Sequence, residues 1–329
     1  MKSTEFASIV SLIRVWESKL LGRNQYDRMI DSENLSEALK FLSETPYGSF
    51  LEGDNFETAL NAAASNMYSD IAKASPYKIL VDFMRVKYDY HNIKALVKGK
   101  ILEKDFSDIL VPNGIINIDE LKAVINGAAV KEFPSIMNEA IEAVLADYEE
   151  TKDPQRIDII LDKYMFSHMK RIVKDINNEF INKYLNVLID LTNIKTLLRV
   201  KKLNKEVAFF RELLIEGGSI DKKTFNELYS EDLEGISHKL SSSEYGNMLK
   251  DSMEYYAKTD SFASLEKNID NYLMNYMKKA KFINLGPEPI IVYMFARETE
   301  IRNLRIILVG KLNKVSENLV RERLRDSYV

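Results

Sequence analysis

The residue types that most often carry out catalysis or bind metals are scarce in this sequence. Cysteine is absent, so the chain has no thiolate nucleophile and no thiolate ligand for zinc. It has three histidines, and no two of them share the spacing of a metal motif such as H-E-x-x-H or E-x-x-H. These are His91, His168 and His238. We therefore predict no metal site, no catalytic residue and no cofactor.

Phosphate-binding and hydrolytic motifs are also missing. Gly99-Lys100 and Gly310-Lys311 lack the upstream glycine and the following Ser or Thr of a phosphate-binding loop. Neither G-x-G-x-x-G nor G-x-S-x-G occurs. The sequence therefore favours a non-catalytic protein without a small-molecule substrate.

One polar pattern does recur, and it occurs three times. Its form is acid-x-x-Asn-[Ile/Leu]-[Lys/Arg]-x-apolar-apolar-x-x-Lys, and its copies are Asp89–Lys100, Asp190–Lys201 and Glu300–Lys311. The asparagines are 101 and 110 positions apart (193 − 92 and 303 − 193), which is close to a third of the 329 residues. Three copies of one unit therefore fill the chain.

The acid of this motif falls on the apolar side of a helix. With the asparagine at 0°, the apolar positions +1, +4 and +5 lie at about 100°, 40° and 140°, and the acid at −3 lies among them at about 60°. A carboxylate on a core-facing stripe needs partners, so we expect it to accept hydrogen bonds from a neighbouring helix end or from the equivalent asparagine. The alternative is a carboxylate that transfers protons. The predicted structural residues are Asp89, Asn92, Asp190, Asn193, Glu300 and Asn303.

The cation of the motif falls on the other side of the helix, at about 200°. The three cations are Lys94, Lys195 and Arg305. If three units stand around a pseudo-threefold axis, these cations form a ring that faces one lumen or one partner. The alternative is an ordinary solvated helix face.

Composition narrows the class of protein. Only 12 Gly and 7 Pro interrupt the chain, which favours long helices over many short strands. With 46 Lys and Arg against 50 Asp and Glu, the net charge of −4 disfavours nucleic acid as a partner. The longest apolar run, Pro289–Phe295, is far shorter than the roughly 20 residues of a spanning helix. We predict no membrane span.

The flanks of the motif divide the chain into units 1–113, 114–217 and 218–329. Pro112-Asn113-Gly114 and Gly217-Gly218 read as helix stops, and Asp119 and Asp221 are predicted to cap the helices that follow. We therefore predict an all-α fold of three pseudo-threefold-related helical repeat units.

The sequence resembles the C subunits of the A/V-type ATPases, a family related to the d subunit of the eukaryotic vacuolar ATPases. The similarity lies in the motif copies at Asp89–Lys94, Asp190–Lys195 and Asn303–Arg305, and it extends to both ends of the chain. The similar end segments are Ile13-Arg14-Val15, Glu17-Ser18-Lys19-Leu20-Leu21, Glu44-Thr45-Pro46-Tyr47 and Arg321–Val329. Val200 and Val309 depart from their counterparts in the other copies, which makes the threefold symmetry approximate.

The resemblance implies a helical funnel on the cytoplasmic face of a membrane rotor ring. Its socket would receive the foot of the central stalk, made of the D and F subunits, and it would transmit torque without breaking any bond. The choice between H⁺ and Na⁺ belongs to the membrane ring in such a complex. Two other hypotheses remain open at this point: a helical-repeat scaffold of another cytosolic complex, and an all-α enzyme with an unrecognised site.

Overall fold

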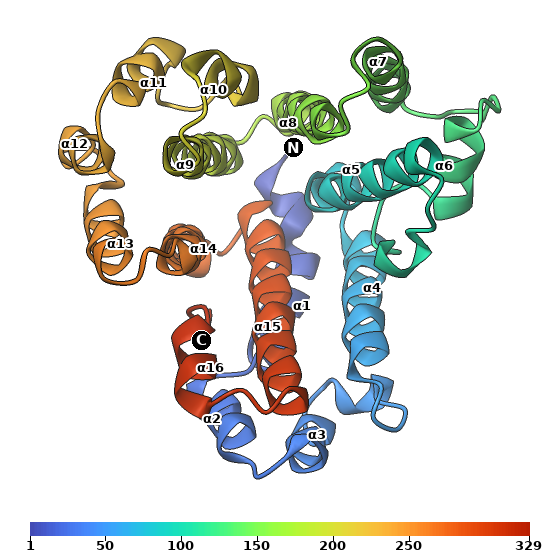
Figure 1. Ribbon diagram of the computed structural model, residues 1–329. Helices are drawn as coiled ribbons and strands as arrows, with labels where there is room; N and C mark the ends of the chain where they lie inside the picture. The colour runs from blue at the N-terminus through green and yellow to red at the C-terminus, as the bar shows by residue number, and fades with distance from the viewer. The chain divides into compact units, whose positions relative to one another are not determined.

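The computed structural model describes residues 1–329, and all of its regular secondary structure is helical (Figure 1). This confirms the predicted all-α class. The longer helices are α4 (Phe56–Ala74), α5 (Ile79–Leu102), α7 (Ser135–Thr151), α8 (Gln155–Ile176), α9 (Glu179–Lys202), α13 (Gly246–Thr259), α14 (Ala263–Lys278) and α15 (Glu288–Leu312). The shorter ones are α1 (Ala7–Glu17), α2 (Arg23–Asp31), α3 (Leu35–Ser43), α6 (Ile118–Ile125), α10 (Val207–Leu213), α11 (Lys222–Tyr229), α12 (Leu233–Lys239) and α16 (Glu317–Arg323). The 3₁₀ turns are η1 (Ser3–Phe6), η2 (Gly48–Phe50), η3 (Ser107–Ile109) and η4 (Lys279–Phe282).

The chain forms two compact units. One contains residues 1–76 and 186–329, and the other contains residues 77–185. Helix α9 begins in the second unit and ends in the first. The predicted division into three repeat units rests on a recurring sequence pattern. Compactness does not test such a pattern, so the division stays a prediction.

In the unit of residues 77–185, α5 and α7 both pack against α8. Two ion pairs lie along the α5–α8 contact: Lys94 Nζ is 2.5 Å from Asp162, and Lys98 Nζ is 2.7 Å from Asp158. The two acids are four residues apart, as are the two lysines, so both pairs lie on one face of each helix. They fix the register of α5 against α8.

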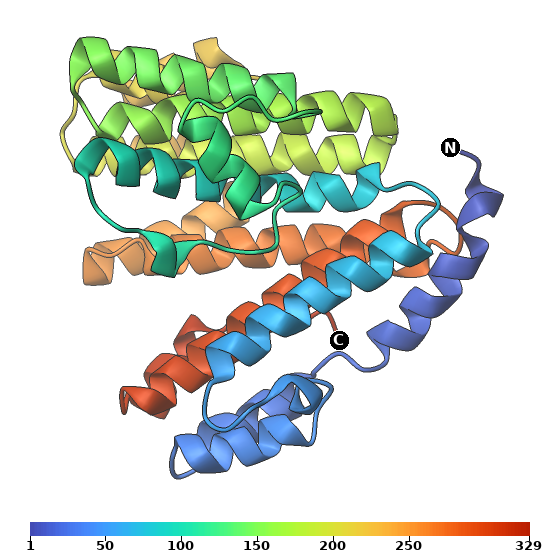
Figure 2. The ribbon, with the colours of Figure 1, turned by 90° about the vertical axis from the view of Figure 1, so that its right-hand side faces the viewer.

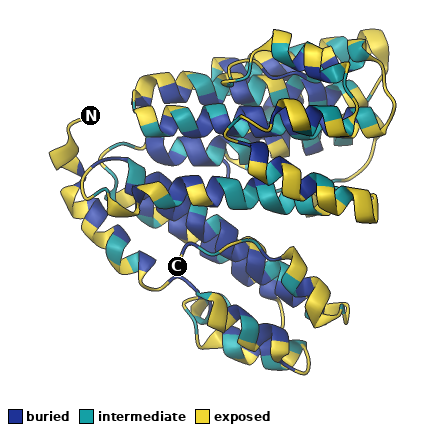
Figure 3. Ribbon diagram, turned by 90° about the vertical axis from the view of Figure 1, so that its left-hand side faces the viewer, coloured by how far each residue is buried: buried dark blue, intermediate teal, exposed yellow.

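In the other unit, α15 is the central helix, and α1, α2, α3, α4 and α14 pack around it. Its apolar residues surround the whole helix rather than one stripe, and such a helix must be buried. Figures 1 and 2 show α4 running alongside α15, and Figure 3 shows buried residues on the facing sides of helices and exposed ones on the outer sides. None of the helices has the length and apolar character that a membrane-spanning segment requires.

The predicted helix starts are correct at one position and wrong at the other. Asp221 caps α11, and its carboxylate accepts from Thr224 N at 2.7 Å. At α6 the cap is Asn117 and not Asp119, because the extended backbone at Asn117 places its side chain over the first turn. Asp119 lies inside that turn, where an acid is still favourable because of the helix dipole.

Candidate functional site: a backbone clamp present three times

The asparagines of the three motif copies each hold a passing segment of backbone. Asn92 Nδ2 donates to Val111 O at 2.8 Å, and Val111 N donates to Asn92 Oδ1 at 2.8 Å. Asn193 makes the same two bonds to Ile215, at 2.8 and 3.0 Å. Each asparagine is 0–1% exposed, so its amide satisfies a backbone donor and acceptor that are shielded from water.

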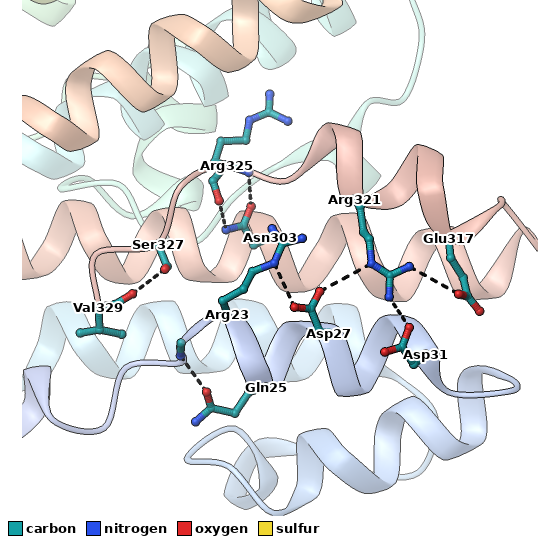
Figure 4. Close-up of polar contacts among 11 residues, drawn as sticks. Arg23, Gln25, Asp27, Asp31, Asn303, Glu317, Arg321, Arg325, Ser327 and Val329 are labelled. Atoms are coloured by element: carbon teal, nitrogen blue, oxygen red, sulfur yellow. Dashed lines mark hydrogen bonds and ion pairs between the residues drawn. The ribbon is translucent and has the colours of Figure 1, made fainter.

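The third copy repeats this geometry near the end of the chain. Asn303 Nδ2 donates to Arg325 O at 3.0 Å, and Arg325 N donates to Asn303 Oδ1 at 2.9 Å. Figure 4 shows the two bonds side by side. The bonded residue follows the asparagine by 19, 22 and 22 positions in the three copies.

The acids hold the next stretch of the same segment. Asp89 accepts from Ile115 N and Ile116 N, both at 2.9 Å. Asp190 accepts from Ser219 N and Ile220 N, both at 3.0 Å. Each carboxylate uses both oxygens on the backbone just before a helix, which leaves no free oxygen to act as a general base. Both acids thus hold the backbone that precedes the next helix, and neither bonds to the equivalent asparagine.

Two glycines allow this close approach. A Cβ on Gly114 would lie 2.3 Å from Asp89 Oδ1, and a Cβ on Gly218 would lie 2.0 Å from Asp190 Oδ1. No side chain fits at either place without moving the acid. The glycines that read as helix stops in the sequence therefore also make room for the carboxylate.

The last lysine of each motif copy binds a carbonyl oxygen at the end of another helix. Lys100 Nζ donates to Ile125 O, the last residue of α6, and Lys201 Nζ donates to Tyr229 O, the last residue of α11. Lys311 Nζ donates to Ser32 O, directly after α2. A cation at a helix C-terminus satisfies a free carbonyl and opposes the helix dipole. We call the acid, asparagine and lysine of one copy, with the backbone they hold, a backbone clamp.

In the third clamp, the held segments come from opposite parts of the chain. Glu300 accepts from Leu21 N, which precedes α2, whereas Asn303 holds Arg325, which follows α16. Ion pairs join α16 to α2, with Arg321 3.6 Å from Asp27 and also bonded to Asp31 (Figure 4). Each contact of the first two clamps joins residues at most 30 positions apart, whereas Glu300 holds a residue 279 positions away.

Glu300 and Arg297 form a buried ion pair in the third clamp. Glu300 also accepts from Tyr47 Oη at 2.7 Å, and the Arg297 guanidinium lies 4.1 Å above the Tyr47 ring. Burial raises the pKa of Glu300, and the charge of Arg297 and the donors around it oppose that rise. Burial also raises the pKa of Tyr47, so its hydroxyl remains a donor.

A tyrosine turn supports two of the clamps and was missed in the sequence. Tyr245 Oη donates to Asp190 at 2.9 Å, as Tyr47 does to Glu300. The two tyrosines lie in similar turns, Thr45-Pro46-Tyr47-Gly48 and Ser243-Glu244-Tyr245-Gly246. In each turn the Thr or Ser hydroxyl donates to a carbonyl three residues earlier and accepts from the N–H of the tyrosine, and a glycine follows. The hydroxyl-x-Tyr-Gly pattern was the available signal.

Two of the three motif cations lie on helix–helix contacts inside the chain. Lys94 pairs with Asp162 on α8, and Arg305 Nε lies 2.9 Å from Glu57 on α4. Lys195 is half-buried on α9. These pairs hold helices together, and the idea that the three cations contact a partner stays a prediction.

Asp89 provides a pH-dependent test of the first clamp. Burial raises the pKa of its carboxyl from 3.8 to about 6, against the two amides that favour the charged form. The folded state therefore binds this proton more tightly than the unfolded chain. The contribution of Asp89 to the free energy of unfolding is largest below pH 4, and it falls as the pH rises through 6. From pH 7 to pH 5, we expect it to raise the free energy of unfolding by about 1 kcal/mol.

The measurement is urea denaturation of the wild-type and Asp89→Asn chains at both pH values, with the exposed Asp251→Asn as control. Asp89→Asn should lose the gain and be less stable by about 1–3 kcal/mol at pH 5, because one amide loses its acceptor. An unchanged pH dependence would contradict the assignment.

Comparisons with known proteins identify the family of this chain. The family of ATP synthase (C/AC39) subunits matches residues 9–323, so the chain belongs to that family. It is thus a subunit of a V/A-type rotary ATPase.

Individual relatives cover nearly all of the chain. The C subunit of the V-type sodium ATPase of Enterococcus hirae is 25% identical over 327 residues, which are 98% of this chain and 99% of the relative. The C subunit of the A-type ATP synthase of Methanobrevibacter smithii is 27% identical over 316 residues, 91% of this chain and 82% of the relative. Its counterpart in Methanocaldococcus jannaschii is 27% identical over an alignment of 349 residues, which covers 98% of this chain and 86% of the relative. A rotary-ATPase subunit is therefore favoured over a scaffold of another complex.

Proposed function

We propose that the chain is the non-catalytic central-stalk subunit that couples the D–F shaft to the membrane proteolipid ring. In this role it links ATP hydrolysis or synthesis to H⁺ or Na⁺ translocation. It attaches peripherally, through the ring, at the cytoplasmic side of the membrane.

The observation that carries the proposal is the backbone clamp, present three times with the same pair of asparagine–backbone bonds. A rotor coupler must transmit torque without yielding. The first two clamps tie a long helix to the start of a following helix through buried bonds that are costly to break. The third clamp joins segments from both ends of the chain, so neither end is left to move independently of α15.

The chemistry of the clamps supports the same role. Their carboxylates have their oxygens engaged with backbone amides, a tyrosine or an arginine. Buried groups that are this fully bonded provide rigidity rather than proton transfer. The acids thus stabilise the fold, and the proposal assigns ATP chemistry to other subunits.

Reconstitution tests the proposal. The purified chain is mixed with the detergent-solubilised proteolipid ring and with the D–F pair, separately and together. We expect it to bind each one and to bridge them, so that D–F sediments with the ring only when the chain is present. A ring and shaft that join equally well without the chain would refute the coupling role.

A further inference from the structure

A cavity of about 230 Å³ lies between α1, α4, α15 and the turn at η2. All of its lining residues belong to the unit of residues 1–76 and 186–329, so its form does not depend on the other unit. A cavity of about 150 Å³ can hold a benzene molecule. This one therefore has room for an aromatic ring that carries a small polar group.

Arg297 lines this cavity and has most of its hydrogen-bond donors unused. It is 7% exposed, and its one hydrogen bond within the chain runs from Nη1 to Glu300. Its Nε and Nη2 groups donate to nothing in the chain, yet neither is fully buried, so both open onto the cavity. Nε and Nη2 form one edge of the guanidinium fork, and such an edge binds a carboxylate through two parallel hydrogen bonds.

Two aromatic residues of the lining also carry unused donors. The rings of Trp16 and Tyr293 have their centroids 5.6 Å apart, with an angle of 34° between their planes. Neither the indole N–H nor the Tyr293 hydroxyl makes a hydrogen bond within the chain, and neither is fully buried. Burial raises the pKa of Tyr293 to about 12, so its hydroxyl keeps its proton at neutral pH. The lining thus offers aromatic surface with donors at its edges.

Free donors outnumber free acceptors around the cavity. Lys19 is an exposed residue of the lining, and its ammonium group has no ion-pair partner in the chain. Asp70 is the only acid of the lining, and its Oδ2 already accepts from Asn66 Nδ2 at 2.8 Å. The cavity therefore favours a ligand that accepts hydrogen bonds and carries negative charge, which describes a carboxylate.

We propose that this cavity is a binding site for a small aromatic carboxylate of about the size of benzoate. The carboxylate accepts two hydrogen bonds from Nε and Nη2 of Arg297, and the ring lies against Trp16 and Tyr293. Because Nη1 of the same guanidinium holds Glu300, a ligand that binds only this folded arrangement also stabilises the third backbone clamp. The site is independent of the coupling role, and either can fail without the other.

The test begins with the unaltered full-length chain. Trp16 is its only tryptophan, so tryptophan fluorescence reports occupation of the cavity directly. The chain is titrated with benzoate, benzamide and inorganic phosphate, and calorimetry repeats each titration. We expect benzoate to change the fluorescence saturably and to bind roughly tenfold more tightly than benzamide, which has the ring without the charge. Benzoate should also bind roughly tenfold more tightly than phosphate, which has the charge without the ring.

Two variants then place the ligand in the cavity. Ala63→Leu fills part of the cavity and keeps every donor, and Ala62→Leu, beside it but outside the lining, is the matched control. We expect Ala63→Leu to weaken benzoate binding by roughly tenfold or more and the control to bind as wild type does, with circular dichroism to check folding. Lys19→Gln, at an exposed position, should weaken benzoate binding by only about two- to fivefold.

The outcomes on the unaltered chain decide the proposal even if Ala63→Leu does not fold. Benzoate that gives no saturable response would overturn it. Equal affinity for benzamide would show that the site does not recognise the charge, and equal affinity for phosphate would show that it does not recognise the ring; either result would also overturn the assignment. A folded Ala63→Leu chain that binds benzoate as tightly as wild type would place the ligand elsewhere.

Discussion

Replacing Arg297 by methionine is expected to lower the free energy of unfolding by about 3–5 kcal/mol. Arg297 is 7% exposed and Glu300 is 3% exposed, so the variant leaves a carboxylate buried without its counter-charge. Methionine fills much of the space but supplies no donor, and the contact with the Tyr47 ring is also lost. Urea denaturation of the full chain at pH 7 measures the loss.

Two comparisons separate the lost charge from lost packing. The double variant Arg297→Met/Glu300→Gln removes both charges and should recover at least half of the loss, because a neutral amide can still accept from Leu21 N. The single variant should also regain stability as the pH falls, since protonation of Glu300 removes the uncompensated charge. A double variant as unstable as the single one would show that the ion pair is not the source of the effect.

The second large effect is expected at the clamp asparagines. Each of Asn92→Ala, Asn193→Ala and Asn303→Ala should lower the free energy of unfolding by about 2–4 kcal/mol. Each change leaves one buried backbone N–H and one C=O without a partner, and alanine cannot replace either bond. The three values should agree closely, because the three geometries agree. Chemical denaturation of each chain gives the values.

The exposed Asn247→Ala is the matched control and should change stability by less than about 0.5 kcal/mol. If the three clamp variants were as stable as this control, the clamps would contribute little to rigidity. The coupling role would then lose its structural support.

The sequence allowed much of the fold and the polar core of the clamps to be predicted. The helix period and the scarcity of breakers predict an all-α chain, and the acid on the apolar stripe predicts a buried hydrogen-bonded group. Both follow from properties of the residue itself, its polarity and its place on a helix. The structure shows Asp89, Asp190 and Glu300 buried and bonded.

What the clamps hold could not be predicted. The held residues, Val111, Ile215 and Arg325, share no side-chain property, because they bond through their backbone. A backbone partner leaves no residue-type signal at its position. For the same reason, the sequence gives no sign that the third clamp binds Leu21, which precedes Glu300 by 279 positions.

The environment of the motif cations could not be predicted either, for a different reason. A helical wheel places Lys94 and Arg305 away from the apolar stripe, but it does not say whether that side meets water, a partner or another helix. The structure pairs them with Asp162 and Glu57, on helices that are far away in sequence. Only the packing of α5 on α8 and of α15 on α4 determines this.

ATP-driven ion pumping is the most direct test of the coupling role. The assembled ATPase, with and without this chain, is reconstituted into vesicles, and ATP hydrolysis and ion uptake are measured on the same sample. We predict that the complex without the chain hydrolyses ATP in its soluble head but accumulates no ion, and that adding the purified chain restores pumping. Full ATP-driven pumping without the chain would contradict the account.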